Sequence, residues 1–588
     1  MIFTKKFITS LLCISCSFLF IHSSSFGFVQ TKTGSGLPLK WPNGFKVNFA
    51  GNPTNQSSIH PDYFFQVIAQ GLQKWKSASG NAFNFDYWQG TSSSTYIQNS
   101  QYNGQSSIYF VSQSTDRMGL DSGVLGYTQV WYNTGSGEIL ETDIVLNDYN
   151  FFFTPNPQDS HFNQNSRRIF IENVVTHELG HVFGLSHSSA LQDTMLYVEA
   201  PEQNTLSCNE WTGIRSIYAT GSLGMGKISG SIVSQNNNPV FGAHVYAISS
   251  TRGVVFTTAI TDKNGNYTLS GLEPGNYYVM AEPYLAGGAS LSEYYTNINP
   301  NICNGSPFGR TFLTLNNQPN SLQSISVGNS QNVQVGSLTA RCSSSVVRDS
   351  GNNLSNAKTI SIASGYGGLD QIGNGNGFYK LTEFSGNKLV IHALSYTLFS
   401  AVQTTLKLYD RYGNEISSKT QSPVFHGDSG ITNYNSSLIA ENLYDSEYYL
   451  QITSNVLNSS AFPMGNQFLD PNVFYVFVIN SNPSTPQFLN EIEVNSECEN
   501  TKSLFPYQSP GGLPPRNSTL TGSSEQKNNN GILGFCGTIQ NNNKIPPPSA
   551  NALWGWFSPF LFMFISFLSN RFILRLKFSK SALNIKSI

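Results

Sequence analysis

The segment THELGHVFGLSH, residues 176–187, decides how the rest of the sequence is interpreted. On a helix, His177 and His181 lie four residues apart, so their side chains project from one face and can bind the same metal ion. Glu178, next to the first histidine, is placed to take a proton from a water molecule on that ion. The segment therefore predicts a helix that carries two metal ligands and a general base.

Gly184 predicts a sharp turn after this helix, because glycine readily adopts the left-handed conformation that ends a helix. Such a turn would bring His187 back to the same ion as a third nitrogen ligand. Three protein ligands and one open position are typical of a catalytic zinc, whereas a structural zinc is closed by four protein ligands. We therefore expect Zn2+ bound by His177, His181 and His187, with Glu178 as the catalytic residue.

The same residues complete the HExxHxxGxxH signature, and in this the sequence resembles the metzincin zinc endopeptidases. Ser188 follows the third histidine, as in the matrixins, and Met195 lies downstream where a Met-turn would pass beneath the metal. Ser207 and Glu210 form a predicted capping box at the start of a segment similar to the matrixin C-terminal helix. The resemblance covers about residues 37–220 and implies zinc-dependent cleavage of polypeptide substrates.

The order of predicted elements in this region matches a matrixin catalytic domain of the α+β class. Pro61 opens a helix with an apolar stripe at helical spacing, which predicts core packing. The residues of this stripe are Phe64, Ile68, Leu72 and Trp75. Strands are predicted before and after the helix, at residues 45–49, 106–112, 124–131 and 142–147.

Residues 124–128 lie where the resemblance puts the edge strand above the cleft. An exposed edge offers unpaired backbone donors and acceptors to an extended peptide, and the alternative is an ordinary covered strand. Tyr197 lies two residues beyond Met195, where astacin-like and serralysin-like relatives place a tyrosine that supports the transition state. Matrixins usually place tyrosine directly after the methionine. Two interpretations of Tyr197 stay open, an aromatic wall of the pocket or an auxiliary oxyanion donor.

Two features differ from the animal matrixins. Tyr127 and the strand at residues 143–147 offer no histidines for a second, structural zinc, so we expect that site to be missing. Asp121, Asp143 and Asp148 could hold Ca2+, against the alternative that these acidic residues are solvated. No cysteine-bearing propeptide is recognisable before the first strand, so a thiolate on the zinc is not expected to keep the enzyme latent.

The composition of the 588-residue chain favours β-rich extracellular modules. Only 11% of its residues are charged, against roughly 25% in ordinary globular proteins, and Asn, Ser, Gly and Thr supply the polarity instead. A net charge of -2 gives no electrostatic case for nucleic acid as a partner. Residues 1–27 are interpreted as a secretory signal peptide, because Lys5 and Lys6 precede an apolar run followed by small residues. We therefore expect the protein to be secreted.

Five of the seven cysteines lie outside the signal peptide. Export permits disulfides, and proximity along the chain makes Cys303 with Cys342, and Cys498 with Cys536, plausible pairs. Cys208 would then be the odd cysteine, a small buried apolar residue on the last helix of the catalytic domain.

Two all-β domains are predicted after a glycine-rich linker. In residues 227–342, alternating strands and turns predict a small β-sandwich, which resembles the carboxypeptidase regulatory-like modules. In residues 352–482, further strands predict a second sandwich, similar to bacterial pre-peptidase C-terminal domains. By analogy, these sandwiches would attach the protein to a cell surface or matrix.

The C-terminal part is predicted to contain a spacer and a hydrophobic helix. Residues 509–551 are rich in Pro, Gly, Ser and Asn, which predicts a flexible, disordered spacer. Residues 552–568 are almost wholly apolar, and basic residues follow in the tail to residue 588. This arrangement predicts a transmembrane or sorting helix that anchors the chain in a membrane.

Together these features predict a multidomain chain with an α+β metzincin-like catalytic domain, two all-β sandwich domains, the spacer and the hydrophobic helix. The function that they favour is a secreted or surface-anchored zinc endopeptidase that acts on extracellular proteins. One alternative is a surface adhesin or matrix-binding protein with an inactive protease domain, although Glu178 and all three histidines are present. Another is an amidase or other hydrolase, although the edge strand and the Met-turn favour a polypeptide substrate.

Overall fold

The computed structural model describes the chain from Phe28 to Gln540 with gaps. The described residues are 28–90, 102–112, 120, 123–157, 159, 167–190, 193–199, 203–218, 224–250, 254–284, 291–299, 301–315, 318–342, 348–371, 373–384, 386–395, 398, 400, 402–419, 436–456, 475–481 and 535–540. We call residues 28–218 the first domain, 224–342 the second domain and 348–481 the third domain.

The first domain is built on one sheet, in which five of its own strands follow the order β2-β1-β3-β5-β4. Strands β2, β1, β3 and β5 run parallel to one another, whereas β4 is antiparallel to β5. The strands are β1 (Lys46–Asn52), β2 (Asn84–Gln89), β3 (Ser106–Phe110), β4 (Val124–Tyr132) and β5 (Ile139–Leu146). The short strands β6 (Phe152–Thr154) and β7 (Arg168–Phe170) pair in parallel outside this sheet.

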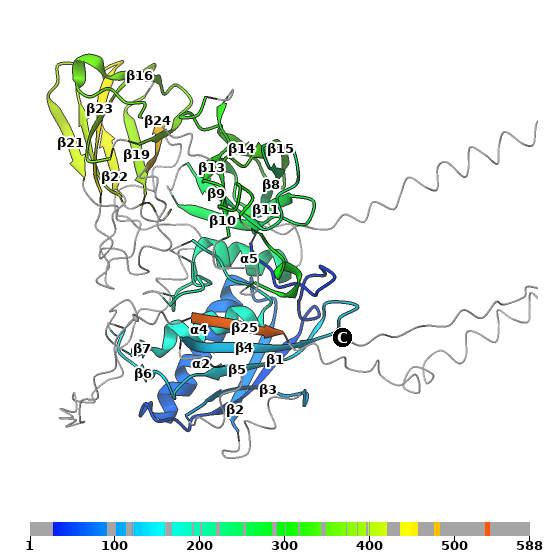
Figure 1. Cartoon of the computed structure of the whole chain (residues 1–588). Helices are drawn as coiled ribbons and strands as arrows, with labels where there is room; N and C mark the ends of the chain where they lie inside the picture. Colours follow the sequence, from blue (N-terminus) through cyan, green and yellow to red (C-terminus); the bar gives the residue numbers. More distant parts are fainter. Residues whose placement is uncertain are drawn as a thin grey trace, which may run out of the picture. The chain divides into compact units, whose positions relative to one another are not determined.

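Two helices of the first domain, α2 (Pro61–Ala78) and α4 (Ile171–Val182), pack against each other, and α4 also packs against β4 and β5 (Figure 1). The predicted apolar stripe of α2 is fully buried. Trp75 at the end of this stripe donates its indole N–H to the backbone oxygen of Thr176, with a donor–acceptor distance of 2.9 Å. Trp75, which the stripe predicts to be a core residue, therefore also fixes the position of α4.

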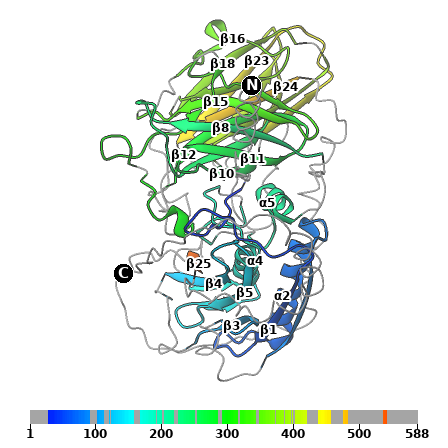
Figure 2. The same ribbon diagram turned by 90° about the vertical axis from the view of Figure 1, so that its right-hand side faces the viewer.

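The last helix of the first domain is α5 (Cys208–Tyr218), which packs against α2 and against strands of the second domain (Figure 2). The predicted capping box is present in part at its start, because Ser207 Oγ accepts from Asn209 and not from the backbone N–H of Glu210. The backbone N–H of Ser207 donates to Glu210 Oε2 at 3.0 Å, and the backbone N–H of Asn209 donates to Ser207 Oγ at 3.2 Å. Trp211 of α5 lies in the same buried cluster as Leu269 of the second domain, so the two domains share apolar packing.

The second domain consists of two sheets, as the alternating sequence predicts. One sheet has the order β10-β9-β12-β13 with β14 also paired to β12, and the other has the order β11-β8-β15. Its elements are β8 (Gly226–Val233), β9 (Ala243–Ser249), β10 (Val255–Ile260), β11 (Asn266–Leu272), β12 (Gly275–Pro283), η3 (Glu293–Tyr295), β13 (Thr311–Phe312), β14 (Ile325–Val327) and β15 (Asn332–Thr339).

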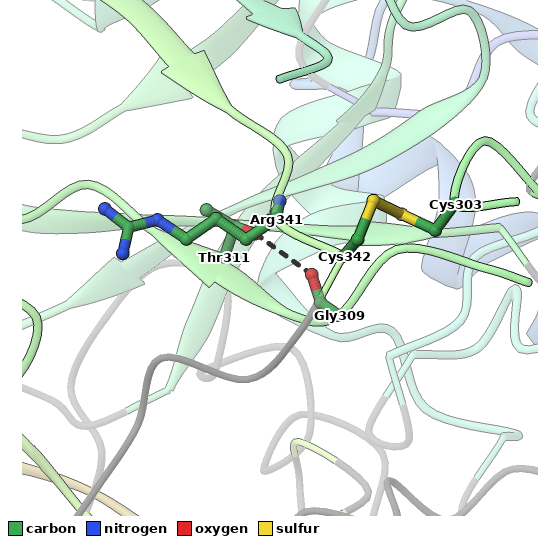
Figure 3. The surroundings of a disulfide bond; sticks show 5 residues. All are labelled: Cys303, Gly309, Thr311, Arg341 and Cys342. Carbon is green, nitrogen blue, oxygen red and sulfur yellow. Dashed lines mark hydrogen bonds between the residues drawn. A yellow bond between two sulfur atoms is a disulfide. The ribbon is translucent and has the colours of Figure 1, made fainter. Parts of the chain in front are cut away.

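A disulfide between Cys303 and Cys342 closes the second domain, and it joins two segments that are 39 residues apart (Figure 3). Beside it, the backbone N–H of Arg341 donates to Thr311 Oγ1 at 3.3 Å. The backbone N–H of Gly309 donates to the backbone oxygen of Arg341 at 2.9 Å. The expectation that Cys208 is the odd, unpaired cysteine is wrong. This residue is buried, as predicted, but it is also disulfide-bonded.

The third domain also consists of two sheets, with the orders β16-β18-β23-β20-β21 and β17-β24-β19-β22. The inner faces of these sheets form a separate apolar cluster that includes Tyr379, Leu406 and Leu450. The elements are η5 (Leu354–Asn356), β16 (Lys358–Ser361), β17 (Tyr366–Asp370), β18 (Gly375–Thr382), β19 (Lys388–Leu394), β20 (Val402–Tyr409), β21 (Glu415–Lys419), β22 (Ser436–Glu441), β23 (Tyr448–Val456) and β24 (Tyr475–Ser481). The likeness to pre-peptidase C-terminal domains stays a prediction.

One strand differs from the sequence prediction. Within residues 509–551, which predict a spacer, β25 (Phe535–Gln540) pairs in parallel with β4 and becomes the sixth strand of the first domain's sheet (Figures 1 and 2). The predicted signal peptide (1–27) and hydrophobic helix (552–568) lie outside the described residues. Within the described part of the chain, no helix has both the length and the apolar character that a membrane crossing requires.

We predict that the double variant C303A/C342A lowers the stability of the second domain. The disulfide restricts the unfolded chain over a 39-residue separation, which corresponds to about 4 kcal/mol of free energy of unfolding in the chain-entropy description. Denaturant-induced unfolding, followed by intrinsic fluorescence, measures the change. The wild-type protein with reductant is the control, and an unchanged midpoint in the double variant would contradict the prediction.

Candidate metal centre

Helix α4 and the turn after it bring the three predicted histidines together. The Nε2 atoms of His177 and His181 are 3.2 Å apart, and those of His181 and His187 are also 3.2 Å apart. All three side chains are buried, with exposed fractions of 1% or less. Three imidazole nitrogens therefore face one point inside the first domain.

Backbone oxygens hold two of these rings by the opposite nitrogen. Nδ1 of His177 lies 2.7 Å from the Thr194 oxygen, and Nδ1 of His181 lies 2.9 Å from the Leu185 oxygen. A carbonyl oxygen can only accept, so each Nδ1 carries the proton and donates it, which leaves the Nε2 lone pair for a metal. The hydrogen bonds thus set both the tautomer and the direction of each ring.

Gly184 makes the turn that returns the chain to the site. Its φ angle is +85°, in the left-handed region that favours glycine, and a Cβ atom there would lie 2.4 Å from the Leu39 oxygen. Any larger residue would meet both a strained backbone and the neighbouring segment. The prediction that Gly184 ends the helix in a sharp turn is confirmed.

Met195 lies directly beneath α4, as the Met-turn resemblance implies. A Cβ atom on Gly180 would come within 2.2 Å of Met195 Sδ and 2.9 Å of the Trp75 ring. The backbone oxygen of Met195 also accepts a hydrogen bond from the Ser188 N–H at 2.8 Å. Gly180, between the two helix histidines, is therefore the position at which α4 and the Met-turn approach each other closely.

Two buried carboxyl groups, of Asp193 and Glu210, hold the Met-turn from below. Glu210 Oε1 accepts the Met195 backbone N–H at 3.1 Å, and Asp193 Oδ2 accepts the side-chain amide of Asn209 at 2.7 Å. Burial raises the pKa of both groups, and for Asp193 the neighbouring Glu210 charge adds to the effect. The capping box of α5 is therefore also part of the support of the metal centre.

The Glu178 side chain lies against strand β4. The hydroxyl of Thr128 donates to Glu178, with Oγ1 2.7 Å from Oε2 and 3.0 Å from the backbone oxygen. A Cβ atom on Gly126 would lie 3.5 Å from Glu178 Oε1, so the carboxylate is packed against β4. The sequence places Thr128 on the edge strand, but nothing in its spacing predicts this contact with Glu178.

The residues present fit Zn2+. Burial, and then the neighbouring His187, lowers the pKa of His177 to about 3, and the same causes hold the pKa of His181 well below its usual value. Neutral imidazole is the form that binds metal. Three converging imidazoles match the protein ligands of a catalytic zinc site. Among the described residues, His177, His181 and His187 make up the one cluster that could hold a metal ion.

Asp143 and Asp148 are not part of this cluster. Asp143 Oδ1 accepts the backbone N–H of Ser107 at 2.7 Å, and Asp148 Oδ2 accepts the hydroxyl of Ser112 at 2.9 Å. Asp121 lies outside the described residues, so Ca2+ stays a prediction. The Tyr197 ring lies against Tyr284 of the second domain, with ring centroids 6.4 Å apart.

The geometry is that of a metzincin-type zinc metalloprotease centre. Comparison with known families then identifies the particular family of each of the first two domains. Residues 41–219 match the family model of the matrixins, and residues 227–288 match that of the carboxypeptidase regulatory-like domain. The chain therefore carries a matrixin domain followed by a carboxypeptidase regulatory-like domain, which confirms both predicted resemblances. No curated protein matches the chain significantly.

We predict that H187A abolishes stoichiometric zinc binding, because two imidazoles without the third ligand leave the ion weakly held. E178Q is the matched control, since the amide keeps the shape of the carboxylate and leaves all three imidazoles in place. Elemental analysis of the purified proteins, with circular dichroism as a test of folding, measures the difference. Equal zinc content in folded H187A and in the wild type would exclude His187 as a ligand.

Proposed function

We propose that the protein is an exported zinc endopeptidase in which Glu178 is the general base. The observation that carries the proposal is the convergence of the imidazoles of His177, His181 and His187. Glu178 belongs to the same helix as the first two of these, and Thr128 holds its carboxylate at 2.7 Å. A zinc ion held by those imidazoles would polarise the scissile carbonyl and make water more acidic. The match to the matrixin model supports this reaction class.

The roles of the protein's own groups follow from their positions. Glu178 takes one proton from the attacking water as the oxygen–carbon bond forms, and it delivers that proton to the amine nitrogen as the carbon–nitrogen bond breaks. Thr128 is a positioning residue, because its hydroxyl holds the carboxylate from the side of β4. The N–H and C=O groups on the outer edge of β4 would hold an extended polypeptide by adding it to the sheet as a strand.

Export and surface attachment belong to the same proposal. The disulfide between Cys303 and Cys342 supports an oxidising compartment, and so does Cys208, which is a third disulfide-bonded cysteine. The signal peptide, the anchoring of the tail in a membrane and the attachment of the β-sandwiches to a cell surface or matrix stay predictions from the sequence.

We predict that E178A keeps its zinc but loses hydrolysis of casein or gelatin, because the water then lacks its proton acceptor. General-base catalysis contributes about 10² to 10⁴-fold to a rate, so the loss should lie in that range or above it. A chelator should abolish wild-type activity, and added zinc should restore it. Chelator-insensitive turnover, or full turnover by E178A, would contradict the proposal. A protein that binds zinc but has no hydrolytic activity, even as a chain that ends at residue 534, would favour the adhesin alternative.

We also predict that T128V lowers kcat by about tenfold, since valine keeps the shape of threonine but removes the hydroxyl that orients the base. KM and zinc content should stay near the wild-type values, because β4 keeps its backbone and the imidazoles are untouched. T128S retains a hydroxyl and should recover most of the lost kcat. A uniform loss in T128V and T128S, or a loss of zinc in T128V, would assign Thr128 a purely structural role.

A further inference from the structure

Strand β25 occupies the edge of the sheet at which a substrate would bind. It pairs in parallel with β4, and the register places Cys536 opposite Gly126, Thr538 opposite Thr128 and Gln540 opposite Val130. The pairing shifts by one residue at the start of β25, between Phe535 and Cys536. Apart from β25, β4 has β5 as its neighbour on one side, so β25 covers the other side of the strand.

The covered part of β4 is the part that touches the general base. Gly126 and Thr128 are the two β4 residues that lie against the Glu178 carboxylate, and their partners belong to the middle of β25. Neighbouring strands lie about 4.8 Å apart, so the β25 backbone runs one strand spacing beyond these contacts. β25 also packs against α4, the helix that carries Glu178 and two of the histidines.

Two chains cannot use the same backbone groups of β4 at once. The outward N–H and C=O groups of this strand can pair either with β25 or with an extended polypeptide. β25 and a bound polypeptide would also compete for the space beside α4. Substrate therefore has to displace β25 before it can reach the centre.

We propose that residues 535–540 are a built-in inhibitory strand, which occupies the substrate edge of the matrixin domain and keeps the full-length chain latent. The inference rests on the proposed endopeptidase function and adds its regulation. It also supplies a source of latency other than a cysteine thiolate on the zinc, since the sequence leads us to expect no cysteine-bearing propeptide before the first strand.

The covalent connection makes a short strand sufficient for this purpose. Residues 482–534 join the third domain to β25, and this stretch is rich in Pro, Ser, Asn and Gly. A tethered segment acts at an effective concentration that can reach the order of millimolar for short flexible connections, and lower values for longer ones. A six-residue strand that binds weakly as a free peptide can therefore stay paired within the chain. A cut in the connecting stretch would remove that advantage and release the site.

The first test compares full-length protein with a chain that ends at residue 534, both loaded with zinc. We expect the shorter chain to hydrolyse casein on the order of tenfold faster or more, because its β4 edge is open. The full-length variant T538P/I539P should be activated in the same way. In a strand, the backbone N–H groups of successive residues point alternately to its two sides. Either T538P or I539P therefore removes an N–H group that donates to β4. T538A/I539A keeps both donors and should remain latent.

Two results of this comparison would overturn the proposal. One is a full-length chain as active as the shortened chain. The other is a shortened chain that is activated while T538P/I539P stays latent, since latency would then reside in another part of the tail.

The second test does not depend on activity. In E178Q, hydrogen exchange of the amides of residues 124–130 should be on the order of tenfold slower in the full-length chain than in the chain that ends at residue 534. Equal exchange would show that β25 does not occupy β4, whatever the enzyme does. A different outcome is a shortened wild-type chain that binds zinc but is inactive, while the full-length E178Q chain still shows slower exchange than the shortened one. In that case the proposed endopeptidase function fails, but the pairing of β25 with β4 stands.

A synthetic peptide of residues 533–541 with the C536S substitution tests the strand directly, because serine removes a thiol that could chelate zinc by itself. We expect this peptide to inhibit the shortened chain at concentrations on the order of millimolar, and a scrambled peptide to have no effect. Mass spectrometry should find the peptide intact. No inhibition, or rapid cleavage of the peptide as a substrate, would overturn the proposal.

Discussion

The metal centre depends on two hydrogen bonds that the backbone makes to imidazole rings. The Thr194 and Leu185 oxygens accept from Nδ1 of His177 and His181 at 2.7 and 2.9 Å, and so direct both Nε2 lone pairs to one point. Burial lowers the pKa of His177 and His181, so these two rings are neutral and their Nε2 lone pairs can bind a divalent cation. Both carbonyl groups lie in turns rather than in α4, so the turns that follow the helix are as important to the site as the helix itself.

Strand β4 connects this centre to the two surfaces that would control it. On its inner side, Thr128 and Gly126 contact Glu178. On its outer side, the same residues form the edge to which β25 is paired. One strand thus contacts Glu178, the proposed general base, and presents the backbone groups for which substrate and the C-terminal segment would compete. Because β4 has both sets of contacts, strand addition at this edge would, under the proposed mechanism, affect the catalytic centre without any change in the ligands.

The parts of the structure that follow from local patterns could be predicted from the sequence. The HExxHxxGxxH spacing predicts the convergence of the histidines, the α2 stripe predicts its buried face, and Ser207 with Glu210 predicts the cap of α5.

Contacts between distant segments could not be predicted in this way. The hydrogen bond from Thr128 to Glu178 joins residues 50 positions apart, and no periodicity reports such a pair. β25 was missed because its flanks have the composition of a spacer, and a six-residue strand that depends on a partner more than four hundred residues away leaves little signal. Cys208 was misjudged for a related reason, since proximity along the chain is a poor guide to disulfide pairing.

The most direct test of the central claim is zinc K-edge X-ray absorption spectroscopy of the purified protein, because it reports the ligands of the ion itself. The account predicts one zinc with first-shell nitrogen or oxygen scatterers at about 2.0–2.1 Å. It also predicts outer-shell scattering that requires three imidazoles. A spectrum that requires fewer than three imidazoles, or a protein that binds no zinc under conditions in which it is folded, would contradict the account.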